Sequence, residues 1–226
     1  MTIRHHVSDA LLLDYATGSL GEGWSIAVAS HLALCPSCRK RLTLMESAGG
    51  ALFSVTHAAP SDGPAIDDSW ARMRARLLDK PDAGNLPSAP SPAMKSPVAP
   101  TLPEPLRSYV GGDVDTLQWR SLGRGAYHLP IATGDKSTSV RLLRIPAGGP
   151  VPEHGHRGRE LTLVLAGSFH DETGVFARGD FEEADEDLEH QPVAMPGADC
   201  ICLAVTDAPL RFRSWVVRLA QPFLGI

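Results

Sequence analysis

The 226-residue sequence contains no uninterrupted apolar run of about 18 residues, the length that is typical of a membrane span. Its first residues, Met1–His6, have no apolar stretch after Arg4, so they lack the pattern of a secretory signal peptide. These two absences remove the usual signs of membrane insertion and export. They predict a cytoplasmic protein.

Clustered basic charge is also missing. The net charge is -5, and residues 1–80 contain eight Lys and Arg against eight Asp and Glu. Direct binding to DNA or RNA requires a concentrated basic surface, so we expect no direct nucleic-acid contact. Any role in transcription is therefore expected to act through a protein partner.

Cysteine is scarce, but the four cysteines occur as two close pairs. In a reducing compartment a Cys-x-x-Cys pair such as Cys35 and Cys38 more often binds metal or does redox chemistry than forms a structural disulfide. A thioredoxin-like site would lie near a βαβ pattern, which is absent here. Cys200 and Cys202 fall on one face of an expected strand, and we interpret them as small core residues, with oxidation-sensitive thiols as the alternative.

Proline is concentrated in one segment. Residues 81–106 hold eight prolines in 26 positions, and proline fixes φ and lacks an N–H group. The composition predicts a semi-extended linker over 81–107. The linker divides the chain into a helical domain at 1–80 and a β-rich domain at 108–226, so the predicted class is α+β with two domains.

About four helices are predicted in the N-terminal domain. Ser8 is the expected N-cap of a helix over 9–16 that stops at Gly18, and further helices are expected over 22–34 and from Pro36.

The last predicted helix begins at Asp67 or Asp68 and carries an apolar stripe. Trp70, Met73 and Leu77 follow the spacing i, i+3, i+7, which places them on one helical face. This stripe requires a cover, which is either the rest of its own domain or a protein partner.

The sharpest motif in the N-terminal domain is His31-x-x-x-Cys35-x-x-Cys38. His31 is expected one turn before the end of its helix, and the two cysteines flank the turn into the next helix, so three donors can converge on one tetrahedral ion. A closed zinc site needs a fourth ligand, which His5 or His6 can supply by folding back. The competing interpretations are a redox cysteine pair and an ordinary interior histidine.

The C-terminal domain changes to short apolar segments separated by Gly and Pro turns, a pattern typical of a β-sandwich or barrel. Strands are expected over 139–145, 161–166, 200–205 and 212–217.

The sequence His154-x-His156-x-x-x-Glu160 is close to the first motif of cupin barrels. Side chains alternate along a strand, so the two histidines point the same way, and Glu160 enters from the start of the next strand. Two imidazoles and a carboxylate then share one interior site. We therefore predict an all-β cupin barrel for this domain.

The second cupin motif is present in part. His190 stands eleven residues after Gly179, which is the expected separation, and it is the predicted fourth ligand. Asp185 and Asp187 replace the usual Pro and Gly, and Ala194 replaces the usual Asn, so the surrounding turn departs from the motif.

A site of three histidines and one carboxylate suits zinc, manganese, nickel or iron, and an empty barrel is the alternative. The acidic run over 182–189 holds six carboxylates and is expected to form a solvated loop.

Together these motifs resemble ChrR-type zinc-binding anti-sigma factors with a C-terminal cupin domain. The resemblance covers essentially the whole chain, including the opening Met-Thr-Ile-Arg-His-His-Val-Ser-Asp-Ala-Leu-Leu. It implies a helical domain wedged between the two domains of an RpoE-type sigma factor, which blocks binding to core RNA polymerase, and it favours partner docking of the Trp70, Met73 and Leu77 stripe. The metal ligands that it implies are His6, His31, Cys35 and Cys38 for an N-terminal zinc, and His154, His156, Glu160 and His190 for a cupin metal, with zinc favoured.

The predicted function is that of a non-enzymatic anti-sigma factor. It binds and inhibits an RpoE-type (group IV, ECF) sigma factor and releases it in response to singlet oxygen or related oxidative stress sensed through the cupin domain. The alternative is a metal-dependent, dioxygenase-like cupin enzyme with an N-terminal zinc domain. A third interpretation, compatible with the first, is a redox sensor at Cys35 and Cys38, because zinc thiolates can be oxidised with loss of metal.

Overall fold

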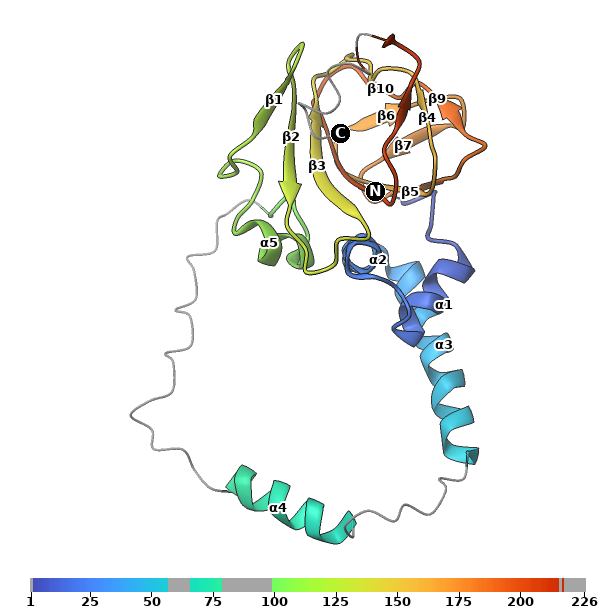
Figure 1. The fold of residues 1–226 in the computed structure, drawn as a ribbon, viewed down its shortest axis with the longest axis vertical. Coiled ribbons are helices and arrows are strands. Elements are labelled where there is room, and N and C mark those ends of the chain that lie inside the picture. The colour runs from blue at the N-terminus through green and yellow to red at the C-terminus, as the bar shows by residue number, and fades with distance from the viewer. Residues whose placement is uncertain (1, 57–65, 79–98, 216, 218–226) are drawn as a thin grey trace. The chain divides into compact units, whose positions relative to one another are not determined.

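The computed structural model describes residues 2–56, 66–78, 99–215 and 217 (Figure 1). Most of the predicted linker, residues 81–98, lies outside the described part of the chain. Within the described part, no helix combines the length and apolar character needed to cross a membrane.

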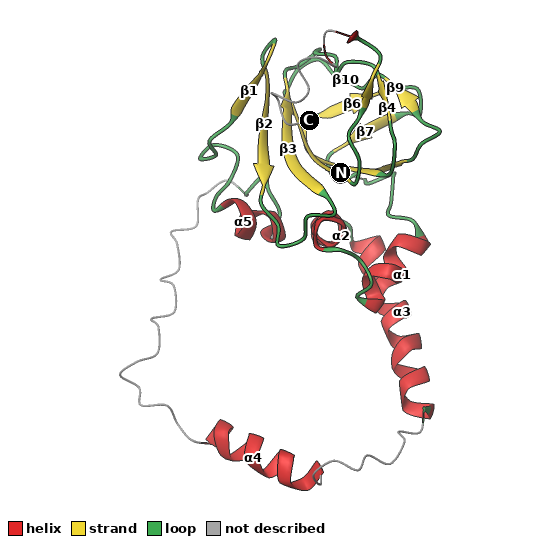
Figure 2. Ribbon diagram, viewed as in Figure 1, coloured by secondary structure: helices red, strands yellow, loops and turns green. Residues whose placement is uncertain are grey.

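Helices lead the chain and strands follow (Figure 2). The predicted α+β class is therefore confirmed. The helices are α1 (Asp9–Thr17), α2 (Glu22–Leu34), α3 (Pro36–Val55), α4 (Ile66–Leu78) and α5 (Glu104–Val110). The strands are β1 (Arg120–Gly123), β2 (Ala126–Ile131), β3 (Ser139–Ile145), β4 (His154–Gly155), β5 (Glu160–Ala166), β6 (Ser168–His170), β7 (Val175–Ala177), β8 (Phe181–Ala184), β9 (Glu189–His190), β10 (Val193–Ala194), β11 (Cys200–Thr206) and β12 (Arg211–Phe212).

The helix boundaries follow the local signals in the sequence. The Ser8 hydroxyl accepts a hydrogen bond from the Leu11 N–H and so caps α1, and Gly18 ends the helix in the left-handed conformation at φ 71°. Helix α2 spans the predicted residues, and Pro36 opens α3 in the first turn, where a missing N–H costs nothing.

Two predicted boundaries are wrong. The linker was expected to continue to residue 107, but α5 begins at Glu104 and its Leu106 side chain is fully buried. Proline is tolerated in the first turn of a helix, and the prolines here lie at the N-cap and in that turn. The last expected strand, 212–217, is shorter than predicted, because β12 ends at Phe212.

The strands form one antiparallel six-stranded sheet in the order β1-β2-β3-β11-β5-β8 and two short sheets, β10-β6-β7 and β12-β4-β9. The two faces of the large sheet bury different clusters. Leu161, Leu163 and Leu165 on β5 belong to a cluster that includes residues of the helices, whereas Val164 joins Cys200 and others in a second cluster.

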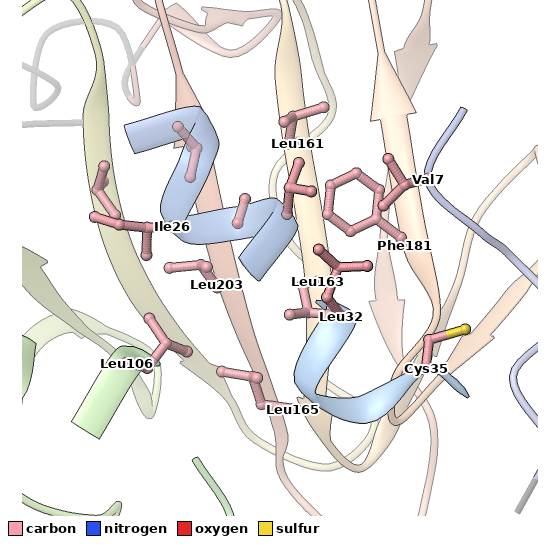
Figure 3. Close-up of a cluster of buried hydrophobic side chains, with 14 of the residues drawn as sticks. Val7, Ile26, Leu32, Cys35, Leu106, Leu161, Leu163, Leu165, Phe181 and Leu203 are labelled. Atoms are coloured by element: carbon pink, nitrogen blue, oxygen red, sulfur yellow. The ribbon is translucent and has the colours of Figure 1, made fainter. Parts of the chain in front are cut away.

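The helical half shares its core with the sheet (Figure 3). Ile26 and Leu32 of α2 lie in the same buried cluster as Leu163 and Leu203 of the sheet, and α2 contacts both β5 and β11. Residues Met1–Ala48 and Pro100–Ile226 consequently form one compact unit, and Gly49–Ala99 form a second. The apolar core of α1 and α2 is thus continuous with the core of the large sheet.

Two candidate metal centres

The turn between α2 and α3 positions three of the four N-terminal candidate ligands. Cys35 caps α2, and its N–H donates to the carbonyl of His31 at 2.8 Å. The Cys38 N–H then approaches the Cys35 sulfur at 3.4 Å, as in a turn that wraps its backbone around a thiolate. Helical spacing and one tight turn therefore place one imidazole and two sulfurs together.

His6 completes this group, which we call the thiol cage (His6, His31, Cys35 and Cys38). His6 Nδ1 lies 3.3 Å from the Cys35 sulfur and 3.5 Å from the Cys38 sulfur, and His31 Nε2 lies 3.2 Å from the Cys38 sulfur. All four donor atoms lie within 4.8 Å of one another. Tetrahedral zinc, with bonds of about 2.0–2.3 Å, separates its ligand atoms by about 3.3–3.8 Å, so the cage fits that ion.

The protonation states also suit a cation. His31 donates from Nδ1 to the Gly179 carbonyl at 2.9 Å, which leaves the Nε2 lone pair free for a ligand. Burial lowers the pKa of His31 to about 4, so the ring is neutral. Burial and the neighbouring Cys35 raise the pKa of Cys38 to about 11, so its thiolate requires a positive charge close by.

The structure separates the two adjacent histidines that the sequence left as alternatives. His6 faces the sulfurs, whereas the His5 ring lies 3.6 Å from the Asp180 carboxylate and packs on Phe176. His6 is therefore the histidine that belongs to the cage.

A second group forms inside the β-rich half, from His154, His156 and His190, and we call it the histidine cluster. Antiparallel pairing of β4 with β9 sets His154 opposite His190, and His156 follows directly after β4. His190 Nε2 lies 3.2 Å from His154 Nε2 and 3.3 Å from His156 Nε2. All three rings are buried, and His154 lines a cavity of about 680 Å³.

The rings are oriented so that their Nε2 atoms converge. His154 donates from Nδ1 to the Pro152 carbonyl at 2.8 Å, and His190 donates from Nδ1 to the Asp171 carboxylate at 2.6 Å. Metal-binding histidines are typically held by such a bond at the second nitrogen. Burial lowers the pKa of His154, which keeps its lone pair available.

Glu160 lies next to the histidine cluster but outside it. Its Oε2 is 3.3 Å from His156 Nδ1, and neither atom has a hydrogen-bond partner although both are buried. Buried polar atoms are rarely left unpaired, so these two atoms are consistent with a site that binds a further polar group or a metal ion. That Glu160 is itself a metal ligand stays a prediction.

Two carboxyl groups that the sequence did not single out lie behind His190. Glu182 Oε1 is 3.7 Å from His190 Nδ1, beside Asp171. Burial, and then the neighbouring Asp171, raise the pKa of Glu182 to about 9. Burial opposes the charge of Asp171 as well, but hydrogen bonds from Thr173, Glu182 and His190 outweigh it and lower its pKa to about 2. At neutral pH one carboxyl is thus protonated and the other charged.

The acidic run is not uniformly a solvated loop, as had been expected. Glu182 and Ala184 of β8 are buried, and the alternation of the strand is the signal that identifies them. The exposed Glu183 between them accepts hydrogen bonds from the backbone and side chain of Ser8.

Cys200 and Cys202 are both buried, with their sulfurs 3.5 Å apart. The hydrogen bond with Cys200, together with burial, raises the pKa of Cys202 well above its usual value. Cys202 therefore remains a thiol, and the burial of both residues agrees with their interpretation as small core residues.

The apolar stripe of α4 is exposed. Trp70, Met73 and Leu77 have 59%, 56% and 71% of their surface accessible.

Known proteins are similar both to the C-terminal part of this chain and to its whole length. A family described as the ChrR cupin-like domain matches residues 108–209. The anti-sigma-E factor ChrR of Cereibacter sphaeroides is 46% identical over 226 residues, which is 100% of both chains.

The fold is also similar to a solved structure. The crystal structure of Rhodobacter sphaeroides SigE in complex with the anti-sigma ChrR contains a chain that is 44% identical to this one. The match has a TM-score of 0.74 and covers 91% of this chain and 100% of the other.

Proposed function

The chain belongs to the family of ChrR-type anti-sigma factors, and we propose that it binds an RpoE-type (group IV, ECF) sigma factor and holds it inactive. The observation that carries this proposal is identity of 46% over the entire length of a curated anti-sigma-E factor. Because a sigma factor acts with RNA polymerase, the proposal places the protein in the cytoplasm. It describes a regulator whose output is a protein complex and not a catalysed reaction.

The exposed stripe on α4 is the surface that we assign to the sigma factor. Trp70, Met73 and Leu77 present three large apolar side chains in a row, which is unfavourable in water without a partner. Amphipathic helices that bind a groove use anchors with this spacing. The structure of a related chain with SigE supports a partner of this kind.

Zinc is the metal that we propose for the thiol cage. Two cysteines and two histidines form a closed donor set that suits structural zinc, which would neutralise the thiolates and join α2 to the segment before α1. For the histidine cluster we propose zinc or another divalent metal, held by His154, His156 and His190 with Glu160 as the fourth ligand.

The histidine cluster is the proposed receiver of the signal, which is singlet oxygen or related oxidative stress. A signal shifts an equilibrium only if it affects the sigma-binding and released states differently. The cluster suits this role because His154 lines a cavity and because the carboxyl groups of Asp171 and Glu182 connect it to β8.

Sigma binding is tested with the purified chain and the group IV sigma factor of the same organism, by gel filtration and by transcription in vitro. The triple variant Trp70→Ala, Met73→Ala, Leu77→Ala should bind at least about 100-fold more weakly, since each buried side chain contributes about 1.5–3 kcal/mol. The matched control is Arg72→Ala, on the opposite face of α4. Equal affinity of the triple variant and wild type would contradict the assigned surface.

Sensing is tested on the complex with a dye that generates singlet oxygen under light. The wild-type complex should dissociate on illumination, whereas the His154→Ala, His156→Ala variant should bind sigma normally and stay bound. Release of sigma from this variant at the wild-type rate would exclude the histidine cluster as the sensor.

A further inference from the structure

Strand β8 is the edge of the six-stranded sheet, and the N-terminal segment that carries His6 runs along it. The Phe181 N–H at the start of β8 donates to the His5 carbonyl at 3.2 Å. An exposed sheet edge is a liability that proteins commonly cover, and here the cover contains a ligand of the thiol cage. The cage is therefore built partly on the cupin half.

Asp180, immediately before β8, is the stronger of two anchors for this segment. One of its carboxylate oxygens accepts hydrogen bonds from the Arg4 N–H at 2.6 Å and the His5 N–H at 2.9 Å. The other accepts from the Ala177 N–H at 2.9 Å and faces the His5 ring. Asp180 has only 2% of its surface exposed, so these charge-assisted bonds are shielded from water.

Glu183 is the second anchor. Its carboxylate accepts from the Ser8 N–H at 2.7 Å and the Ser8 hydroxyl at 3.0 Å, at the start of α1. His6 lies between the residues held by Asp180 and those held by Glu183, so both ends of its short segment are fixed.

Residues at and just before the start of β8 also hold His31 in place. The Gly179 carbonyl accepts from His31 Nδ1, and Phe181 packs its ring edge-on against that imidazole at 5.4 Å between centroids. Gly179 has φ 91°, and a Cβ there would lie 2.6 Å from the Ile3 side chain, so glycine is needed for this close approach. Two of the four cage ligands are consequently oriented by residues 179–183.

From these contacts we propose that Asp180 and Glu183 are positioning residues for the thiol cage, which makes metal retention in the sigma-binding half depend on the cupin half. The inference rests on the proposed zinc site, and it gives the proposed regulation a physical route. Glu182, between the two anchors, points instead toward His190 of the histidine cluster. One short strand thus contacts both centres with alternate side chains.

The experiment follows metal loss from the cage alone, in the full-length chain without any sigma factor. Cobalt(II) bound by cysteine thiolates has a sulfur-to-metal charge-transfer absorption that a histidine and carboxylate site lacks. The cobalt-loaded protein is mixed with excess EDTA, and the decay of this band is timed. Loss of a residue that orients metal ligands typically weakens binding by 10–100-fold, so Asp180→Asn should accelerate the decay by about 10-fold or more.

Asp113→Asn is the matched control. Asp113 likewise accepts from three backbone N–H groups, of Thr101, Leu102 and Val114, but it lies beside α5 and not beside the cage. Its variant should lose cobalt at a rate within about twofold of wild type. Glu183→Gln, an exposed position whose substitution leaves the core intact, should accelerate the decay in the same direction as Asp180→Asn but less.

The outcomes are distinct from those of the sigma-binding test. Unchanged cobalt release in both Asp180→Asn and Glu183→Gln would overturn the inference, whatever the protein binds. If Asp180→Asn does not fold, as judged by near-ultraviolet circular dichroism, Glu183→Gln alone decides. Faster release in a protein that binds no sigma factor would support the inference while refuting the proposed function.

Discussion

The thiol cage and the histidine cluster are both buried groups of converging donors, but they are supported differently. The cage draws three donors from one helix end and the turn after it, and its fourth from a segment held on β8. The histidine cluster draws two rings from strands β4 and β9 and the third from the residue after β4. A carbonyl holds the Nδ1 atom of His154, and a carboxylate holds that of His190. Closed thiolate sites are typical of structural zinc, whereas histidine sites with a cavity beside them are typical of exchange with small molecules. This difference is the reason that we propose assembly for the first centre and response for the second.

The largest expected effect is the loss of metal from the thiol cage alone. Cys38→Ala should remove one metal per chain and abolish sigma binding, because the remaining donors cannot close a tetrahedral site. The histidine cluster should keep its metal in this variant. Metal analysis of the purified protein, with sigma binding measured in parallel, provides the check. Loss of both metals together would show that the two centres are not separate.

The second effect concerns Glu182, the protonated carboxyl behind the histidine cluster. Its pKa of about 9 in the folded protein lies above the value of 4.5 for a free side chain, so wild type loses stability as pH rises between these values. Glu182→Gln removes this dependence. Between pH 6 and pH 8 the variant should gain about 3 kcal/mol relative to wild type, which is the free energy of one proton over two pH units.

Urea unfolding of the metal-free proteins at the two pH values measures this difference. Glu183→Gln, at the exposed neighbouring position, is the control and should show no such trend. A stability difference between Glu182→Gln and wild type that is independent of pH would mean that Glu182 is charged in the folded protein.

The smallest effect concerns Asp171, which accepts the Nδ1 proton of His190. Asp171→Asn weakens this bond without touching the converging nitrogens, so metal affinity of the histidine cluster should fall by about 10–100-fold. The thiol cage should keep its affinity, because Asp171 contacts none of its members. Competition with a metal indicator measures both affinities in one titration. An unchanged affinity of the cluster would remove Asp171 from its support.

Local patterns predicted much of this architecture. Ser8 and Gly18 marked α1, and the spacing of His31, Cys35 and Cys38 placed three donors together because one helix turn and one tight turn fix their geometry. The two histidines of the first cupin motif were likewise found from strand alternation. These features depend on residues close in sequence.

Among features that depend on distant residues, His6 and His190 were predicted, but others were not. Asp171 and Glu182 contact His190 only because the chain folds back on itself. Glu182 also lies in a run of acidic residues, which gave no sign that it is buried. The core shared by α2 and the sheet was also unexpected, because a proline-rich segment suggested two independent domains. Sequence spacing does not reveal which surface a helix will cover.

The most direct test of the account is sigma binding by the full-length chain before and after removal of metal from the thiol cage. Zinc-loaded protein should form a stable complex, and chelator-treated protein should lose it and regain it when zinc is restored. Retention of the complex by protein that metal analysis shows to be free of cage metal would contradict the account.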